Sequence, residues 1–184
     1  MTCTLLNAQN YKKMLWANGL GTTTEVIKVE DEEGLLWRIS MAIVNEEGAF
    51  SSLVGIDRTL IVIDGPGFDL IGDECPHLAQ PLAAVRFSGD IAISATNLAG
   101  PSVDFNVMTA RRAFHHQAEV LHGQQEFSLK GDTNLICALG QAVVGNNGQN
   151  HSLGPRDALM VDGPEEFVLK NDAQVIAVEI FQTC

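Results

Sequence analysis

The sequence has no apolar run that approaches the ~20 residues of a membrane-spanning helix. Residues 1–13 contain no apolar segment after a basic one, so we expect no secretory signal and a cytoplasmic protein. Basic residues are few, with 11 Lys and Arg against 23 Asp and Glu and a net charge of −12. Because an acidic surface repels phosphate groups and no basic cluster offsets it, we expect neither nucleic acid nor a membrane as a partner.

Signals for metal or nucleophilic chemistry are also absent. The four cysteines show no CxxC spacing and are expected to be free thiols. The sequence has no Gly-x-Ser-x-Gly motif, and Gly19-Leu20-Gly21 is too short for a dinucleotide-binding fingerprint. His115 and His116 are adjacent, so on a strand they would point to opposite faces and could not bind one ion together. We therefore expect no metal, no cofactor and no catalytic motif, and interpret the histidines as exposed or hydrogen-bonded loop residues: His77, His115, His116, His122 and His151.

Seventeen glycines interrupt short apolar runs, a pattern typical of many short strands joined by tight turns. Residues 73–82 could hold a helical turn, but Pro76 and Pro81 exclude a long helix there. The acidic residues 30–33 are predicted to form a solvated turn between strands. Strands are expected at 25–29, 36–44, 59–63, 68–71, 83–87, 91–95, 103–108, 126–129, 134–139, 142–144, 158–161, 166–169 and 174–181.

One order of elements occurs twice: strand, Gly turn, strand, loop, strand, Gly/Asp turn, strand. The first copy covers residues 58–95 and the second covers residues 134–181. This order is typical of a cupin half-barrel, a small jelly roll. The sequence therefore predicts an all-β fold, with residues 1–184 forming a single bicupin domain. Its two cupin-like jelly-roll β-barrel halves would cover about 1–110 and 111–184. An immunoglobulin-like sandwich is the structural alternative.

Three segments are dense in residues that suit a ligand pocket. Residues 16–25 combine Trp and Asn with two Gly, a turn whose backbone can approach a ligand closely. In residues 37–42, the two-residue period of a strand places Arg38 and Ser40 on one face. In residues 104–108, Asp104 and Asn106 share a face in the same way. Periodicity alone favours ordinary amphipathic strands with their polar faces in water, and Arg58 fits a turn residue.

Together these segments resemble the HutD/Ves family. Its members carry Trp-x-Asn-Gly-x-Gly-x-Thr-x-Glu near the start, then Trp-Arg-x-Ser, Gly-x-Phe-Ser, Pro-Gly-Ile-Asp-Arg and Asp-Phe-Asn-x-Met. The matching residues of this chain are 16–25, 37–40, 48–51, 54–58 and 104–108, in the same order and with similar spacing. The chain departs from the family pattern in places: Leu20 stands where Gly is common, and Thr24 stands where Arg is common.

The resemblance implies a bicupin fold and a small-molecule pocket without a metal. In the HutD branch it implies a small carboxylate such as formylglutamate, bound to sense or limit histidine breakdown without catalysis. Arg can hold a carboxylate through two parallel hydrogen bonds, Asn can pair with a formyl-amide group, and Asp104 would hold an Arg or Asn in place. The expected ligand-binding residues are Trp16, Asn18, Gly19, Glu25, Arg38, Ser40, Arg58, Asp104 and Asn106.

Other functions fit the same residues. The protein could be a metal-independent cupin isomerase or hydrolase acting on a small carboxylate, with Glu25, Asp57, Asp104 or His77 as the acid or base. It could belong to the Ves branch, which is associated with stress response. It could also be an interaction protein whose pocket is vestigial. In each case we expect a monomer or a homodimer.

Overall fold

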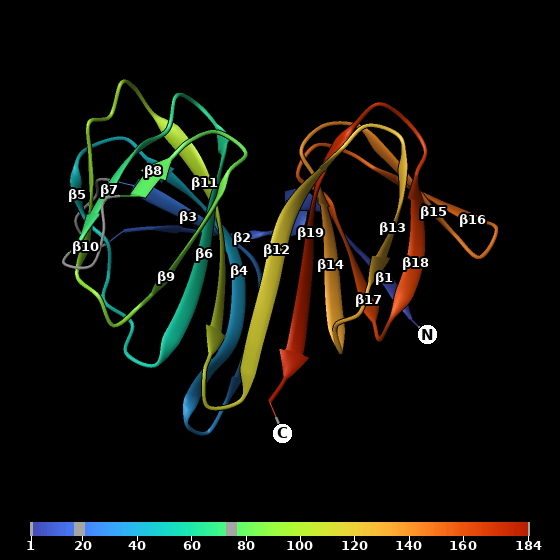
Figure 1. The fold of residues 1–184 in the computed structure, drawn as a ribbon, viewed down its shortest axis with the longest axis horizontal. Helices are drawn as coiled ribbons and strands as arrows, with labels where there is room; N and C mark the ends of the chain where they lie inside the picture. The colour runs from blue at the N-terminus through green and yellow to red at the C-terminus, as the bar shows by residue number, and fades with distance from the viewer. Residues whose placement is uncertain (1, 17–20, 73–76, 184) are drawn as a thin grey trace. The chain divides into compact units, whose positions relative to one another are not determined.

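The computed structural model describes residues 2–16, 21–72 and 77–183 (Figure 1). In this part of the chain the regular elements are strands, apart from one short 3-10 turn, η1 (Ala8–Asn10). The prediction of an all-β fold is therefore confirmed. No helix among the described residues is long and apolar enough to cross a membrane. The chain divides into two compact units, which we call the N-terminal unit (Tyr11–His115 with Thr183–Cys184) and the C-terminal unit (Met1–Asn10 with His116–Gln182).

The N-terminal unit consists of two antiparallel sheets (Figure 1). The larger sheet has the order β2 (Lys12–Leu15), β3 (Gly21–Asp31), β4 (Gly34–Val44), β11 (Ser102–Ala110), β6 (Ile56–Asp64), β9 (Ala84–Ser88). The smaller sheet has the order β5 (Gly48–Ala49), β10 (Ile93–Thr96), β7 (Phe68–Gly72), β8 (His77–Ala79). Strands that follow one another in these orders are joined by backbone hydrogen bonds.

Apolar residues from both sheets form one buried cluster in the N-terminal unit. Alternation along the strands aims every second side chain at this cluster, which is why Leu60 and Val62 of β6 lie in it while Ile61 does not. Burial of this apolar surface is the main favourable term in the stability of the unit. The cluster consists of Val44, Leu60, Val62, Phe68, Leu70, Ala79, Val85, Phe87, Ile93 and Ala95.

The C-terminal unit also consists of two antiparallel sheets. One has the order β1 (Cys3–Leu6), β17 (Ala158–Asp162), β14 (Thr133–Ala138), β19 (Gln174–Gln182), β12 (Phe114–His122), and the other has the order β13 (Gln125–Leu129), β18 (Glu165–Leu169), β15 (Ala142–Asn146), β16 (Gln149–Leu153). Apolar residues of both sheets, among them Ile136, Leu159 and Phe167, form a second buried cluster. None of the four sheets closes into a barrel within the described residues.

All thirteen expected strands overlap strands of the structure. The predicted turn at 30–33 is confirmed in its position, because β3 ends at Asp31 and β4 begins at Gly34. Cys3 and Cys137 are free thiols, as expected, while Cys75 and Cys184 lie outside the described residues.

The interpretation of the histidines as loop residues is wrong for all five of them. His77 lies on β8, His115, His116 and His122 lie on β12, and His151 lies on β16. Strands β12 and β16 carry polar side chains on exposed positions and few buried apolar residues, so their sequences lack the apolar alternation that marks a strand. His115 is exposed and its neighbour half-buried, consistent with opposite faces. The helical turn considered at 73–82 is also absent from its described part, where residues 77–79 form β8.

Candidate functional site

Strand pairing in the N-terminal unit brings distant motif residues onto one face of the larger sheet. Met108 of β11 lies opposite Arg38 of β4 on one side and opposite Arg58 of β6 on the other. Two positions along β11, Asn106 lies opposite Ser40 of β4. Because directly opposed residues of antiparallel strands project from the same face, these five side chains share that face. The interpretation of these polar residues as a solvent face is wrong for Ser40, Asp104 and Asn106, which are all buried.

A cavity of about 490 Å³ opens over this face. The larger sheet, the segment from residue 46 to residue 53 and Ala95 of β10 form its walls. Of the expected ligand-binding residues, Trp16, Arg38, Ser40, Arg58 and Asn106 line it, whereas Glu25 and Asp104 do not, and Asn18 and Gly19 lie outside the described residues. The remaining lining residues are Thr23, Ala42, Val44, Glu46, Glu47, Gly48, Ala49, Phe50, Ser51, Leu53, Ala95 and Met108.

Arg58 is held firmly although its side chain is charged and buried. Its Nη2 donates a hydrogen bond of 2.9 Å to Oδ1 of Asn106. Its guanidinium carbon lies 5.4 Å from the ring centre of Phe50 and 5.0 Å from that of Phe87, both within cation–π range. Within the described residues, its Nε has no hydrogen-bond partner. Burial lowers the pKa of Arg58 to about 10, with Asp104 acting in the opposite direction and Arg38 adding to the decrease. Arg58 therefore remains a cation at neutral pH.

Asp104 lies two residues before Asn106 on β11 and is completely buried, so it does not line the cavity. Its Oδ1 accepts a hydrogen bond of 2.5 Å from Nδ2 of Asn106, while Oδ2 has no partner among the described residues. Burial raises the pKa of Asp104 to about 7, against the opposing effects of the Arg58 charge, the Asn106 hydrogen bond and the backbone of Ala42. This carboxyl group is therefore close to its midpoint of ionisation at neutral pH.

Glu25 holds the second arginine. Its Oε2 lies 3.0 Å from Nε of Arg38, an ion pair whose angles are not those of a hydrogen bond. Both side chains are largely shielded, with 22% of Arg38 and 16% of Glu25 exposed. The register of β3 places Thr24 opposite Met41, on the face turned away from the cavity. Thr24, where the family commonly has Arg, therefore removes no cation from the cavity.

The first residue of β3, Gly21, has to be a glycine. The backbone N–H of Trp16 donates to the carbonyl of Gly21 at 3.0 Å, and the indole N–H donates to Oγ1 of Thr23 at 2.8 Å. A Cβ on Gly21 would lie 2.7 Å from the Trp16 ring and 2.8 Å from the carbonyl oxygen of Ile43. Glycine is thus needed for the close approach that positions Trp16 as a cavity wall.

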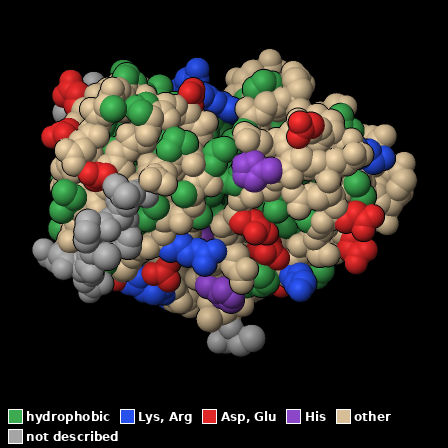
Figure 2. Space-filling model, turned by 45° about the horizontal axis from the view of Figure 1, so that its top comes forward, with side chains coloured by type: hydrophobic (Ala, Val, Ile, Leu, Met, Phe, Trp, Pro, Cys, Tyr) green, Lys and Arg blue, Asp and Glu red, His purple; other side chains and the backbone are tan. Residues whose placement is uncertain are grey.

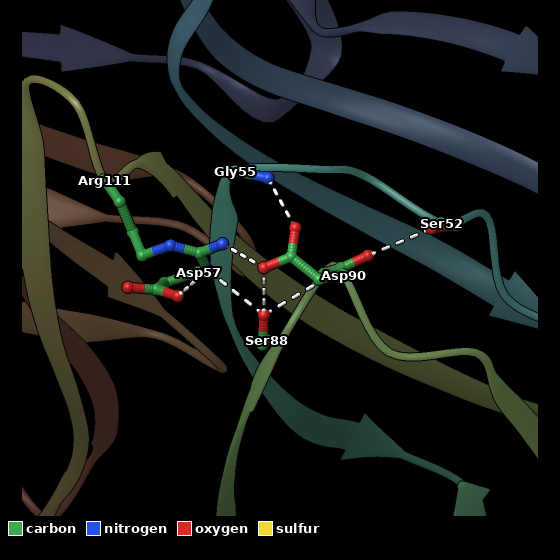
Figure 3. A network of polar contacts seen from close by, with 7 residues as sticks. Ser52, Gly55, Asp57, Ser88, Asp90 and Arg111 are labelled. Carbon is green, nitrogen blue, oxygen red and sulfur yellow. Dashed lines mark hydrogen bonds and ion pairs between the residues drawn. The ribbon is translucent and has the colours of Figure 1, made fainter. Parts of the chain in front are cut away.

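Residues 50–55, of which Phe50, Ser51 and Leu53 form part of the cavity wall, are anchored by a polar network that the sequence did not reveal (Figure 3). The backbone N–H of Gly55 donates to Oδ1 of Asp90 at 2.6 Å, and Ser88 donates to Oδ2 of Asp90 at 2.8 Å. Arg111 binds Asp90 and also Asp57, the latter at 2.5 Å. Asp57 therefore points to this surface network while Arg58 beside it points to the cavity. Ser88-Gly89-Asp90 had only the signal of an ordinary turn.

Two adjacent acidic residues form an exposed part of the cavity lining. Glu46 and Glu47 both line the cavity and are exposed, and Oε1 of Glu47 accepts a hydrogen bond of 2.7 Å from the backbone of Asn97. Acidic side chains are also spread over the face drawn in Figure 2. Among the described residues, no three His, Cys, Asp or Glu side chains are grouped so as to hold a metal ion. Among the described residues that line the cavity, the cationic side chains are those of Arg38 and Arg58.

Sequence comparisons match this chain to one family and to two similar proteins. A family model named HutD matches residues 8–177. An uncharacterized 21.2 kDa protein in the hutC 3′ region of Pseudomonas putida is 32% identical over 169 residues, which cover 89% of this chain and 89% of that protein. Protein Ves of Cronobacter sakazakii is 32% identical over 114 residues, which cover 59% of this chain and 63% of that protein.

Two solved structures have a similar fold, and one of them is a HutD protein. HutD from Pseudomonas fluorescens SBW25 superimposes with a TM-score of 0.88 at 30% identity, covering 100% of both chains. A cupin 2 conserved barrel domain protein from Leptotrichia buccalis superimposes with a TM-score of 0.60 at 8% identity, covering 89% of both chains. At so low an identity the second likeness shows the fold alone, which is cupin-like.

Proposed function

Because the chain belongs to the HutD family, we propose that it binds a small carboxylated metabolite, such as formylglutamate, without converting it, and thereby senses or limits histidine utilisation. The observation that carries this proposal is the pair of arginines on either side of Met108, both lining one cavity. Guanidinium groups present planar, paired N–H donors that match the two oxygens of a carboxylate.

The two arginines among the described lining residues favour an anion between them. Arg38 lowers the pKa of Arg58, so the two cations lie close enough to repel each other. A carboxylate between them would relieve this repulsion. The net charge of −12 opposes an anion at long range, so a local pair of buried or half-buried cations is the feature that such a ligand requires.

The relatives support a role in histidine utilisation. The Pseudomonas putida protein is named for its position in the hutC 3′ region, and it matches a larger share of this chain than protein Ves does. The Pseudomonas fluorescens structure is of HutD in a formate condition, and formate is the smallest carboxylate. The cavity of about 490 Å³ has room for a larger one.

The placement of Glu25, Asp57 and Asp104 favours binding over catalysis. A general acid or base must reach the substrate within hydrogen-bond distance. Glu25 is paired with Arg38, Asp57 lies in the surface network, and Asp104 lies behind Asn106, so none of the three lines the cavity. An isomerase or hydrolase that used one of these three would need it to move, whereas Glu46 and Glu47 line the cavity but are exposed.

We also propose that the two units are the two cupin-like halves of a bicupin. Each consists of two packed antiparallel sheets with its own buried cluster, and the fold resembles a cupin barrel protein. The N-terminal unit alone supplies the lining of the cavity, so the proposed function requires no second copy of the chain.

Isothermal titration calorimetry of the whole chain tests the binding proposal. Formylglutamate, urocanate, glutamate and formate would be titrated separately into the purified protein, and each mixture would be followed by NMR for product. We expect saturable binding of at least one carboxylate without turnover. No heat with any of the four overturns the proposal, and appearance of product replaces it with the enzymatic alternative.

A further inference from the structure

The carboxyl group of Asp104 is buried beside the cavity but does not line it, so direct contact with a ligand does not explain its presence. It is fully buried, hydrogen-bonded through Oδ1 to Asn106, and without a partner at Oδ2 in the described part of the chain. Asn106 in turn accepts from Nη2 of Arg58, which lines the cavity. A chain of two hydrogen bonds therefore connects a buried carboxyl group to the cation that the proposed ligand would contact.

Among the described residues, Arg58 of strand β6 is the charge that acts on Asp104 directly. Arg38 of strand β4 acts on Arg58, and Glu25 of strand β3 is paired with Arg38. Glu46 and Glu47 lie at the cavity entrance and are exposed, as is Asp64 at the end of β6. The residues of β7 and β10 that face this interior are uncharged: Phe68, Leu70, Ile93 and Ala95.

The sum of the charges on Arg38, Arg58, Glu25 and Asp104 depends on whether Asp104 is ionised and whether a carboxylate is bound. When Asp104 is ionised, the two arginines and the two acids sum to zero, and a bound carboxylate would leave the shielded cluster with a net negative charge. When Asp104 is protonated, the same carboxylate brings the sum to zero. An uncompensated charge away from water is costly, whereas a paired one is not.

We infer that binding of a carboxylate in this cavity is coupled to uptake of one proton by Asp104, which acts as a positioning residue for Arg58 through Asn106. This inference rests on the proposed function. The ligand takes over the charge pairing of Arg58, and Asp104 takes up a proton from solvent as its charge is replaced.

The direction of the pH dependence follows from this exchange. Burial raises the pKa of Asp104 to about 7 in the free protein, and a bound anion beside Arg58 raises it further. Below that pH the group is already protonated, and affinity is constant. Above it, binding must bring in a proton, so affinity falls by up to about tenfold per pH unit until the pKa of the bound state is reached.

Calorimetry at about pH 8 in buffers of different ionisation enthalpy tests the coupling, because the slope of observed heat against buffer enthalpy gives the protons taken up. Formylglutamate is a suitable probe, since neither of its carboxyl groups titrates near this pH. We expect uptake of close to one proton in the natural protein. Asp104→Asn, a neutral replacement of the same shape, should bind without uptake and with a dissociation constant that no longer depends on pH.

Asp162→Asn is the matched control, because it removes one exposed carboxylate from β17 in the other unit. It should retain the uptake of the natural protein. Binding with no proton uptake, or uptake that persists in Asp104→Asn, overturns the coupling and leaves the binding proposal intact. No heat with any carboxylate overturns the proposed function, and the coupling with it.

A second measurement covers the case that Asp104→Asn does not fold. In the natural protein labelled with ¹³C at aspartate carboxyl carbons, one signal should titrate near neutral pH. At about pH 8, addition of formylglutamate should move that signal to its protonated position. A signal that stays at its ionised position while the ligand saturates the protein would overturn the coupling.

Discussion

Oδ1 of Asn106 accepts a hydrogen bond of 2.9 Å from Nη2 of Arg58, although the two residues are 48 positions apart in the chain. At its other end the amide donates to Asp104. The reverse amide orientation would set donor against donor and acceptor against carboxylate, so these two partners fix the side chain. Asn106 is therefore mainly a support for Arg58, with one N–H and one lone pair left for a ligand.

Loss of Arg38 should weaken ligand binding while leaving the fold intact, because this side chain is partly exposed and carries no part of the buried cluster. Truncating a charge-assisted hydrogen bond costs about 1.5–3 kcal/mol, which is roughly a 10- to 100-fold loss of affinity. Arg38→Ala would be compared by calorimetry with Arg86→Ala, which removes an exposed arginine of β9 outside the cavity. Equal affinities in the two variants would contradict the assignment of Arg38 to the site.

The stability of the natural protein relative to Asp104→Asn should fall as the pH rises. The pKa of Asp104 is raised from 3.8 to about 7 by burial, so between these values the folded state holds a proton that the unfolded state has lost. The free energy of unfolding therefore decreases with rising pH across this window and levels off above it. Urea unfolding of both proteins at about pH 5 and about pH 8 measures this difference. A gap that does not change, or that changes in the opposite sense, would show that Asp104 is ionised throughout.

Gly21→Ala should displace Trp16 and destabilise the N-terminal unit, because a Cβ would lie 2.7 Å from the indole ring and 2.8 Å from a backbone carbonyl. Overpacking of this kind costs about 1–3 kcal/mol. Gly140→Ala is the control, since a Cβ there would meet nothing within 4 Å. Urea unfolding followed by tryptophan fluorescence reports both stability and the environment of Trp16. The prediction fails if the two variants unfold alike.

Arg111→Ala should loosen the wall at residues 50–55 and weaken ligand binding several-fold. Arg111 holds Asp90, and Asp90 holds the backbone of Gly55 (Figure 3). Arg112→Ala is closely matched, because Arg112 has the same exposed fraction of 38% and also pairs with two acids, Asp31 and Glu33, but at the turn between β3 and β4. Hydrogen exchange of residues 50–56 should accelerate in the first variant only. Acceleration in both, or in neither, would show that the network does not hold this wall.

The sequence was sufficient to predict most strands of the fold and which residues share a face. Strand periodicity is a local property, so the pairing of Arg38 with Ser40, and of Asp104 with Asn106, follows from their spacing in the chain. Whether that face meets water depends on whether a second sheet covers it, which is a long-range property. For this reason periodicity alone favoured a solvent face, and only the family motifs indicated a pocket.

The partners inside the site could not be predicted in the same way. The opposition of Met108 to both Arg38 and Arg58 depends on the register of three strands, and the arrangement of Asp90, Arg111 and Gly55 depends on two turns and a strand end. Strand β12 was missed because the polar residues on its exposed positions hide its pattern. The residue types and the family motifs thus predicted the candidate residues. The register of the strands determined which of them line the cavity.

A crystal structure of the protein with the carboxylate that binds best by calorimetry tests the central claim most directly. We expect density for the ligand in the cavity of the N-terminal unit, with its carboxylate oxygens within hydrogen-bond distance, about 2.7–3.2 Å, of the guanidinium groups of Arg58 and Arg38. A ligand bound elsewhere, or bound in this cavity with its carboxylate turned away from both arginines, would contradict this claim.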